Sequence, residues 1–194
     1  MSPLDLEKQL TFYGAYHHNN VNIAIHMIFV PTILASGLLL ATNSPVLIPL
    51  PPWLSIPGLP LNLGTLGAIG YSGFYLLLEP FAGMITLPLI MGWVAYANHL
   101  TSTVPSPTNK VAIGLQIVSW LIQFVGHGVF EGRAPALLDN LVQAFVLAPF
   151  FVFMELMFKL GYRPELQTRV EKAVLEKIKE FKTGKQDEAP KEPK

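Results

Sequence analysis

The fold of this chain is decided around the stretch Tyr16-His17-His18-Asn19-Asn20-Val21-Asn22-Ile23-Ala24-Ile25-His26, where a polar N-terminus gives way to a long apolar run. Three of the five histidines lie within this stretch. The other two, His99 and His127, also stand at the ends of apolar segments. Imidazoles are costly to bury without a partner, so this placement predicts a metal site at the edge of a membrane.

The distribution of charge identifies the class of protein. Charged residues make up only 13% of the 194 residues, against about 25% in soluble domains. The ranges 9–78, 81–109 and 111–130 contain no Asp, Glu, Lys or Arg at all. A soluble domain needs charges on the outer faces of such segments, so the sequence predicts an integral membrane protein.

Composition also excludes several kinds of site. The net charge is zero, so nothing indicates a nucleic-acid partner. The chain has no cysteine, which excludes disulfides, thiolate metal sites and cysteine nucleophiles. Residues 1–10 lack the basic region of a cleavable signal peptide, so we expect the first apolar helix to remain in the mature protein.

The apolar segments predict an all-α membrane bundle of about four to five apolar helices. A short interfacial helix with Ser2 as its N-cap should come before them, and Asn19 or Asn20 can cap the next helix, which runs to about Ala41. The connection 42–60 is too rich in proline to be regular helix. The remaining apolar segments are close to the ~20 residues that cross a membrane; they cover 61–78, 81–99, 109–130 and 135–161. Four glycines recur every three residues along the first of these, which predicts close helix contact: Gly64, Gly67, Gly70 and Gly73.

The C-terminal part has a different composition. Residues 163–194 contain sixteen of the 26 charged residues of the chain. Apolar residues recur there at helical spacing, which predicts an amphipathic helix: Leu166, Val170, Val174, Ile178 and Phe181. We therefore expect a membrane-embedded catalytic domain at 1–162, followed by a charged cytosolic helix at 163–194 whose tail is disordered from 182 onward.

Helical phase limits how the histidines can share a metal. His26 lies about two turns inside an otherwise apolar helix, where ionisable residues are usually functional. His17 is nine residues earlier, about half a turn out of phase, so both can reach one metal only if the helix begins after His17. His18 fits a continuous helix somewhat better, and spacing alone leaves the choice between His17 and His18 open.

Three other polar residues stand near these histidines. Asn22 lies four residues before His26, so its side-chain amide could orient that imidazole from outside the coordination shell. Glu131 stands in the same relation to His127. Arg133 could hold a substrate carboxylate as a bidentate fork, or could simply extend its charge to the membrane interface. No catalytic side chain is expected beyond the metal ligands.

Neutral imidazoles without thiolates suit Fe, Zn, Cu or Ni. Open coordination positions would fit O₂ activation at Fe(II) or water activation at Zn. The sequence contains no G-x-S-x-G, P-loop or dinucleotide fingerprint. The residues alone therefore leave three hypotheses: a His-metal oxygenase, a His-metal lipid hydrolase or hydroxylase, and a non-catalytic lipid-binding or scaffold protein of the membrane.

Two long motifs resemble the fungal 2-hydroxy fatty acid dioxygenases. The first is Tyr-His-His-Asn-x-x-Asn-x-x-Ile-His-x-x-Phe-Val-Pro at 16–31. The second is Gln-Phe-Val-Gly-His-Gly-Val-Phe-Glu-x-Arg-x-Pro-Ala-Leu at 123–137. The likeness continues through 139–149 and 158–162 and covers about residues 5–165.

The resemblance implies a multi-pass enzyme of the endoplasmic-reticulum membrane that uses Fe(II) and O₂. Its substrate would be a long-chain 2-hydroxy fatty acid, which loses one carbon in the α-oxidation that degrades phytosphingosine. The implied ligands are His17, His26 and His127, with His99 as the fourth. If the segments 61–78 and 81–99 both cross the membrane fully, however, His99 ends on the opposite face from His17 and His127.

Overall fold

The computed structural model describes residues 4–132 and 143–187, and all the regular structure in these ranges is helical. This confirms the predicted all-α class. The helices are α1 (Leu6–Tyr16), α2 (Asn20–Ala41), α3 (Leu63–Leu78), α4 (Pro80–Thr103), α5 (Pro105–Val125), α6 (Ala148–Lys159) and α7 (Pro164–Asp187). A 3-10 turn, η1 (Pro52–Leu54), and two π-helical segments, η2 (Gly126–Glu131) and η4 (Gln143–Leu147), complete the described elements.

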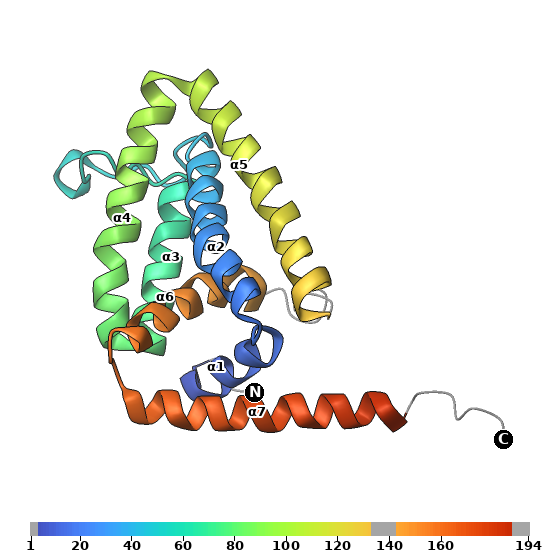
Figure 1. Ribbon diagram of the computed structural model, residues 1–194. Helices are drawn as coiled ribbons and strands as arrows, with labels where there is room; N and C mark the ends of the chain where they lie inside the picture. Colours follow the sequence, from blue (N-terminus) through green and yellow to red (C-terminus); the bar gives the residue numbers. More distant parts are fainter. Residues whose placement is uncertain (1–3, 133–142, 188–194) are drawn as a thin grey trace.

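Helices α2 to α5 run lengthwise beside one another, while α1, α6 and α7 lie across one end of this bundle (Figure 1). Among the described residues, three helical stretches are long and apolar enough to cross a membrane: Asn20–Ala41, Pro80–Thr103 and Pro105–Glu131. The apolar helix α3 is shorter, at 16 residues. The described part of the last expected apolar segment, η4 and α6, ends at Lys159 and is followed by a bend of 120° into α7.

The N-terminal helix begins later than predicted. Asp5 is its N-cap, and the Asp5 carboxylate accepts a hydrogen bond from the backbone N–H of Lys8 (3.2 Å). An aspartate accepts hydrogen bonds from the free N–H groups at a helix start just as effectively as the serine that we expected at this position. Ser2 itself lies outside the described residues.

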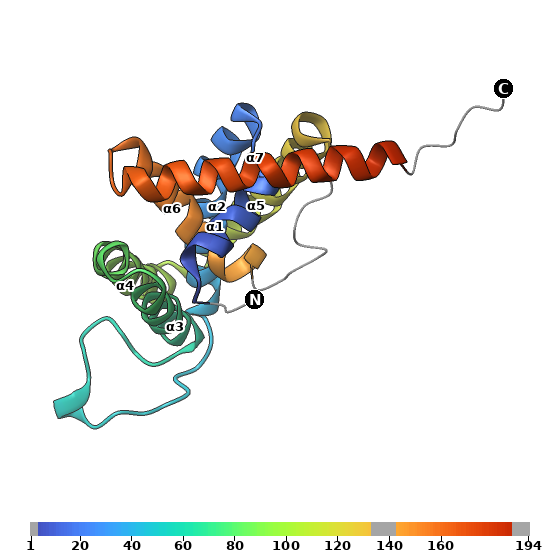
Figure 2. The same cartoon turned by 90° about the horizontal axis from the view of Figure 1, so that it is seen from below.

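The proline-rich connection between α2 and α3 reaches away from the bundle (Figure 2). Its base is fixed by Asn62, whose side-chain amide donates to the Thr42 carbonyl (3.1 Å) and to Asn98 Oδ1 (2.7 Å). Trp53, near its tip, is 83% exposed. These contacts attach the two ends of the connection to α4, while its apolar tip faces outward as expected for an interfacial segment.

Only half of the predicted glycine stripe on α3 makes close helix contacts. A methyl group at Gly64 would lie 2.8 Å from the Leu38 carbonyl oxygen of α2, and one at Gly67 would lie 3.1 Å from the Leu38 side chain. Methyl groups at Gly70 and Gly73 would meet nothing within 4 Å. Gly64 and Gly67 therefore let α2 and α3 approach closely, and the other two glycines do not serve this contact.

Gly64→Ala is expected to destabilise the protein, because the added methyl group would collide with backbone atoms that cannot rotate away. The expected loss is about 1–3 kcal/mol. Gly70→Ala is the matched control: it adds the same atom to the same helix in open space, and should gain up to about 1 kcal/mol through helix propensity. Thermal unfolding of the two variants in detergent tests this prediction, and equal melting temperatures would contradict it.

The amphipathic C-terminal helix is confirmed. Leu166 and Val170 of α7 are buried in the hydrophobic core, and Val174 packs against Gly14 of α1. Arg169 and Glu7 form an exposed ion pair between the same two helices (3.0 Å). The helix continues to Asp187, beyond the point where we expected a disordered tail. The side chain of Phe181 lies outside the described part of the chain.

Candidate metal centre

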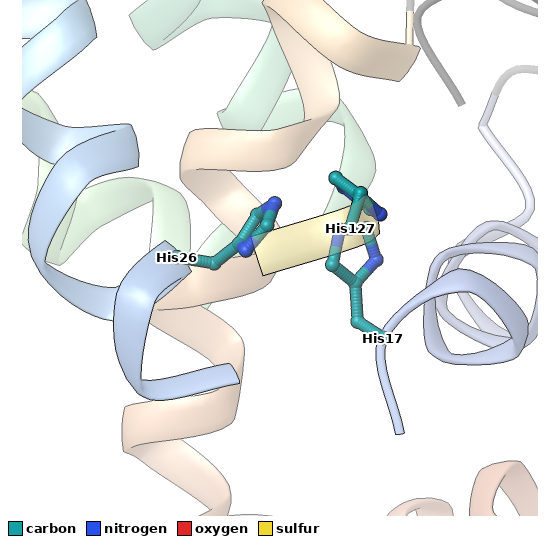
Figure 3. A group of neighbouring side chains, drawn as sticks. All are labelled: His17, His26 and His127. Atoms are coloured by element: carbon teal, nitrogen blue, oxygen red, sulfur yellow. The ribbon is translucent and has the colours of Figure 1, made fainter. Parts of the chain in front are cut away.

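Three histidines meet at the end of the bundle that α1 and α7 cover. His17 lies between α1 and α2, His26 lies in α2, and His127 lies in η2. One ring nitrogen from each lies within 4.8 Å of the others, and the three side chains gather together in Figure 3. All three residues are buried, with exposed fractions of 8%, 4% and 4%. Their rings meet at 70° to 86°, edge toward face, rather than stacking on one another.

A break in the helix allows His17 and His26 to converge. His17 is the C-cap of α1, and Asn19 is the N-cap of α2. The Asn19 side chain accepts hydrogen bonds from the backbone N–H groups of Val21 (2.9 Å) and Asn22 (3.5 Å). The predicted start of a new helix after His17 is therefore confirmed, with Asn19 rather than Asn20 as the cap.

Hydrogen bonds fix the orientation of two of the imidazoles. His17 Nδ1 lies 2.8 Å from the Tyr13 carbonyl oxygen, and His26 Nδ1 lies 2.9 Å from the Asn22 carbonyl oxygen. A carbonyl oxygen can only accept, so Nδ1 carries the hydrogen in both rings and Nε2 keeps its lone pair. This is the usual arrangement of metal-binding histidines. The orienting group on Asn22 is its backbone carbonyl, and the expectation that its side-chain amide would do this was wrong.

The surroundings of His17 keep its ring neutral. Burial, and then the neighbouring imidazoles of His26 and His127, lower the pKa of His17 well below its usual value. Tyr13 stacks on the same ring, with centroids 4.0 Å apart and planes inclined by 17°. A metal binds the neutral form of imidazole, so no proton has to be displaced from His17 Nε2.

Glu131 holds the loop that carries His17, although it was expected to orient His127. Its Oε1 accepts hydrogen bonds from the backbone N–H groups of His18 (2.7 Å) and Asn19 (2.8 Å) and from the Asn22 amide (3.2 Å). Its Oε2 lies 2.8 Å from His18 Nδ1. The carboxylate thereby ties η2, which carries His127, to the start of α2, which follows His17. It is only 2% exposed.

Two other histidines lie apart from this group. His18 is exposed, and its Nδ1 contacts the Glu131 carboxylate. His99 is also exposed and lines a polar recess with Thr42, Asn62 and Asn98, near the base of the proline-rich connection. Because α3 and α4 each run along the bundle, His99 is at the opposite end from His127, as the alternation of segments implied. The structure therefore does not bring His99 to the other candidate ligands. Arg133 lies outside the described residues.

A cavity of about 590 Å³ extends from the three histidines between α2, α3 and α5. Its wall is mostly apolar, and it reaches as far as Leu40, Ala41 and Leu63 near the other end of the bundle. Gln116, Trp120 and Gln123 also line it, although none of them was predicted to be a site residue. Successive members of the set 116, 120, 123 and 127 are separated by three or four residues, which places them on one face of a mostly apolar helix. This spacing was the signal that could have identified them.

The donor set fits a divalent transition metal. Within the described ranges, the group contains three imidazoles and neither a carboxylate nor a thiolate. Such nitrogen ligands suit Fe, Zn, Cu or Ni, and three protein ligands leave coordination positions open for other molecules. The residues that could hold the metal are His17, His26 and His127.

Comparison with known proteins gives two findings. Residues 4–160 match the protein family described as "2-hydroxy-palmitic acid dioxygenase Mpo1-like". The chain is also 44% identical, over 168 residues, to the 2-hydroxy-palmitic acid dioxygenase MPO1 of Saccharomyces cerevisiae. That alignment covers 87% of this chain and 88% of the yeast protein. No solved structure matches the chain.

Proposed function

Since this chain belongs to the Mpo1-like family of 2-hydroxy-palmitic acid dioxygenases, we propose that it is an iron-dependent 2-hydroxy fatty acid dioxygenase of the endoplasmic-reticulum membrane. It removes one carbon from a long-chain 2-hydroxy fatty acid with O₂. The observation that carries this proposal is the group of three buried imidazoles at the head of a long apolar cavity. The imidazoles could bind the metal that reacts with O₂, and the apolar cavity could bind the acyl chain of the substrate.

The cavity accounts for the acyl chain. It follows α2 from His26 to Ala41, a distance of about 22 Å at the rise of an α-helix. This is comparable with the extended length of a palmitoyl chain. Apolar walls such as Val30, Leu34 and Leu38 lose contact with water when the chain fills the cavity, which favours binding. The carboxyl end of the acid then lies at the histidines.

Residues of this chain would hold the metal and position the substrate. His17 and His26, each through Nε2, would hold iron(II) together with the His127 ring. When bound, the iron would supply the redox chemistry that a dioxygenase needs. The Tyr13 and Asn22 carbonyls keep two of these rings in place before any metal binds. Burial of the site excludes bulk water, and the cavity would hold the carboxyl end of the acid beside the three histidines. The balanced reaction converts R–CHOH–COOH and O₂ into R–COOH, CO₂ and H₂O.

The charge distribution supports a cytosolic position for this end of the protein. Helices α1 and α7 cover it and carry seven of the 13 Lys and Arg residues of the chain. Membrane proteins retain such residues on the cytosolic side. The metal centre would then open toward the cytosol, and the proline-rich connection would lie at the lumenal surface.

Purified protein is expected to contain about one iron per chain and to consume 2-hydroxypalmitate only when O₂ is present. A chelator should abolish turnover, and Fe(II) but not Zn(II) should restore it. This is tested by measuring the metal content of the purified protein and the amount of shortened acid formed with and without O₂. Turnover without O₂ would instead indicate the hydrolase hypothesis. Protein that neither binds a metal nor turns over the acid would indicate a lipid-binding or scaffold protein.

A further inference from the structure

Gln123 is a buried polar side chain with an unsatisfied donor beside the three histidines. It is 6% exposed, and its Nε2 has no hydrogen-bond partner among the described residues. It lines the same cavity as His17, His26 and His127. Buried amide groups are rarely left unpaired, because the cost of removing them from water is then not recovered. A free donor that faces a cavity therefore points to a ligand with an acceptor atom.

The pairing of α2 with α5 places Gln123 at the level of the histidines. Gly126 packs against the side chain of Asn22, and Gln116 donates to the Ile33 carbonyl (2.7 Å). These two contacts show that the helices run antiparallel, and the register between them sets Gln123 opposite His26. The amide is therefore at the end of the cavity where the carboxyl end of the acid would bind, rather than along its acyl part.

Gln116 shows what a satisfied glutamine in the same wall looks like. Its Nε2 donates to the Ile33 carbonyl and to Ser36 Oγ (3.0 Å), and its Oε1 accepts from Trp120 Nε1 (3.0 Å). Gln116 thus has a structural role in joining α2 and α5. Gln123, two turns closer to the histidines, has no such partner for its Nε2 in the described ranges.

We propose that Gln123 recognises the 2-hydroxyl group of the substrate and so distinguishes 2-hydroxy fatty acids from ordinary fatty acids. A hydroxyl group both accepts and donates, and a carboxamide does the same, so the two neutral groups are complementary. A buried carboxylate would instead call for a cation. An acid without the hydroxyl group leaves the buried amide unpaired, and sites of this kind reject such analogues. The inference rests on the proposed function, because it assumes that a 2-hydroxy acid occupies the cavity.

The test compares the binding of 2-hydroxypalmitate and palmitate to the iron-loaded protein by displacement of a fluorescent fatty acid, without turnover. Wild-type protein should prefer the 2-hydroxy acid by about ten- to a hundred-fold. Gln123→Met, which keeps the length of the side chain, should lower this ratio roughly ten-fold by weakening 2-hydroxypalmitate alone. Gln116→Met, the same change in the same cavity wall, should leave the ratio unchanged even if it lowers stability.

Equal binding of the two acids by wild-type protein would overturn the proposal without any variant. It would also be overturned if Gln123→Met kept the wild-type ratio, or weakened both acids equally, as loss of a merely structural contact would do. Melting temperature and iron content show whether each variant keeps its fold and centre, and Gln123→Asn, which retains the amide, should preserve part of the preference. If the wild-type protein and Gln123→Met give the expected binding ratios but the protein shows no O₂-dependent turnover, the proposed function is contradicted while Gln123 remains the hydroxyl-recognising group.

Discussion

His26→Ala will abolish metal binding and lower turnover of 2-hydroxypalmitate by at least roughly a thousand-fold, more than the 10–100-fold typical of groups that only orient a ligand. His26 is held by the Asn22 carbonyl with Nε2 free, and its ring centroid lies 4.2 Å from that of His17 and 4.8 Å from that of His127. Two imidazoles alone make a poor site for a divalent metal. The prediction is tested by measuring iron content and product formation on the same preparation of His26→Ala. His127→Ala should show the same two losses.

The controls are the two histidines that lie outside the group. His99→Ala removes an imidazole at the opposite end of the bundle, and His18→Ala removes one that pairs with Glu131. Both variants should keep stoichiometric iron, and His99→Ala should keep full turnover. Loss of iron in His99→Ala would contradict the proposed ligand set and restore His99 as a ligand. A His26→Ala protein that retained iron would exclude the three-histidine centre itself.

Glu131→Ala should weaken iron binding by about 10–100-fold and destabilise the protein by about 3 kcal/mol. The buried carboxylate accepts hydrogen bonds from two backbone N–H groups and from the Asn22 amide, and its loss leaves these donors unpaired. The loop that positions His17 would then lose its attachment to η2 and His127. Metal titration and thermal unfolding in detergent measure the two effects.

Glu7→Ala is the matched control, because it removes a carboxylate from an exposed ion pair with Arg169. Exposed pairs contribute at most about 1 kcal/mol, so iron binding should not change. Glu131→Gln, which keeps one acceptor oxygen, should fall between wild type and Glu131→Ala. If Glu131→Ala lowered stability but left iron affinity at the wild-type value, Glu131 would have no part in positioning the centre.

Much of the fold followed from the distribution of charge and from local helix signals. The uncharged ranges predicted the membrane helices, and the asparagine pair at 19–20 predicted the helix break that allows His17 to turn toward His26. Helix periodicity predicted the amphipathic face of α7. These features could be predicted because each depends on neighbours within one or two helical turns.

The contacts that complete the site could not be predicted in the same way. Glu131 lies four residues from His127, yet its partners are residues 18, 19 and 22, more than a hundred positions away. Spacing along a helix says which side chains share a face, but not what packs against that face. The same limit applies to Gln123, whose role depends on the register between α2 and α5. The family resemblance suggested His99 as a fourth ligand, but the structure places this residue beside Thr42 and Asn62, away from His17, His26 and His127.

Glu131 also matters for the electrostatic potential at the histidines. The N-terminus of α2, a helix of 22 residues, begins six residues before His26, about 9 Å along the axis. It carries the equivalent of about half a positive charge, which disfavours a nearby dication. The Glu131 carboxylate, which accepts hydrogen bonds from the N–H groups of His18 and Asn19, offsets the positive charge of that helix end. In the proposed centre, three imidazole ligands would thus retain a doubly charged ion without an anionic ligand in direct contact with it.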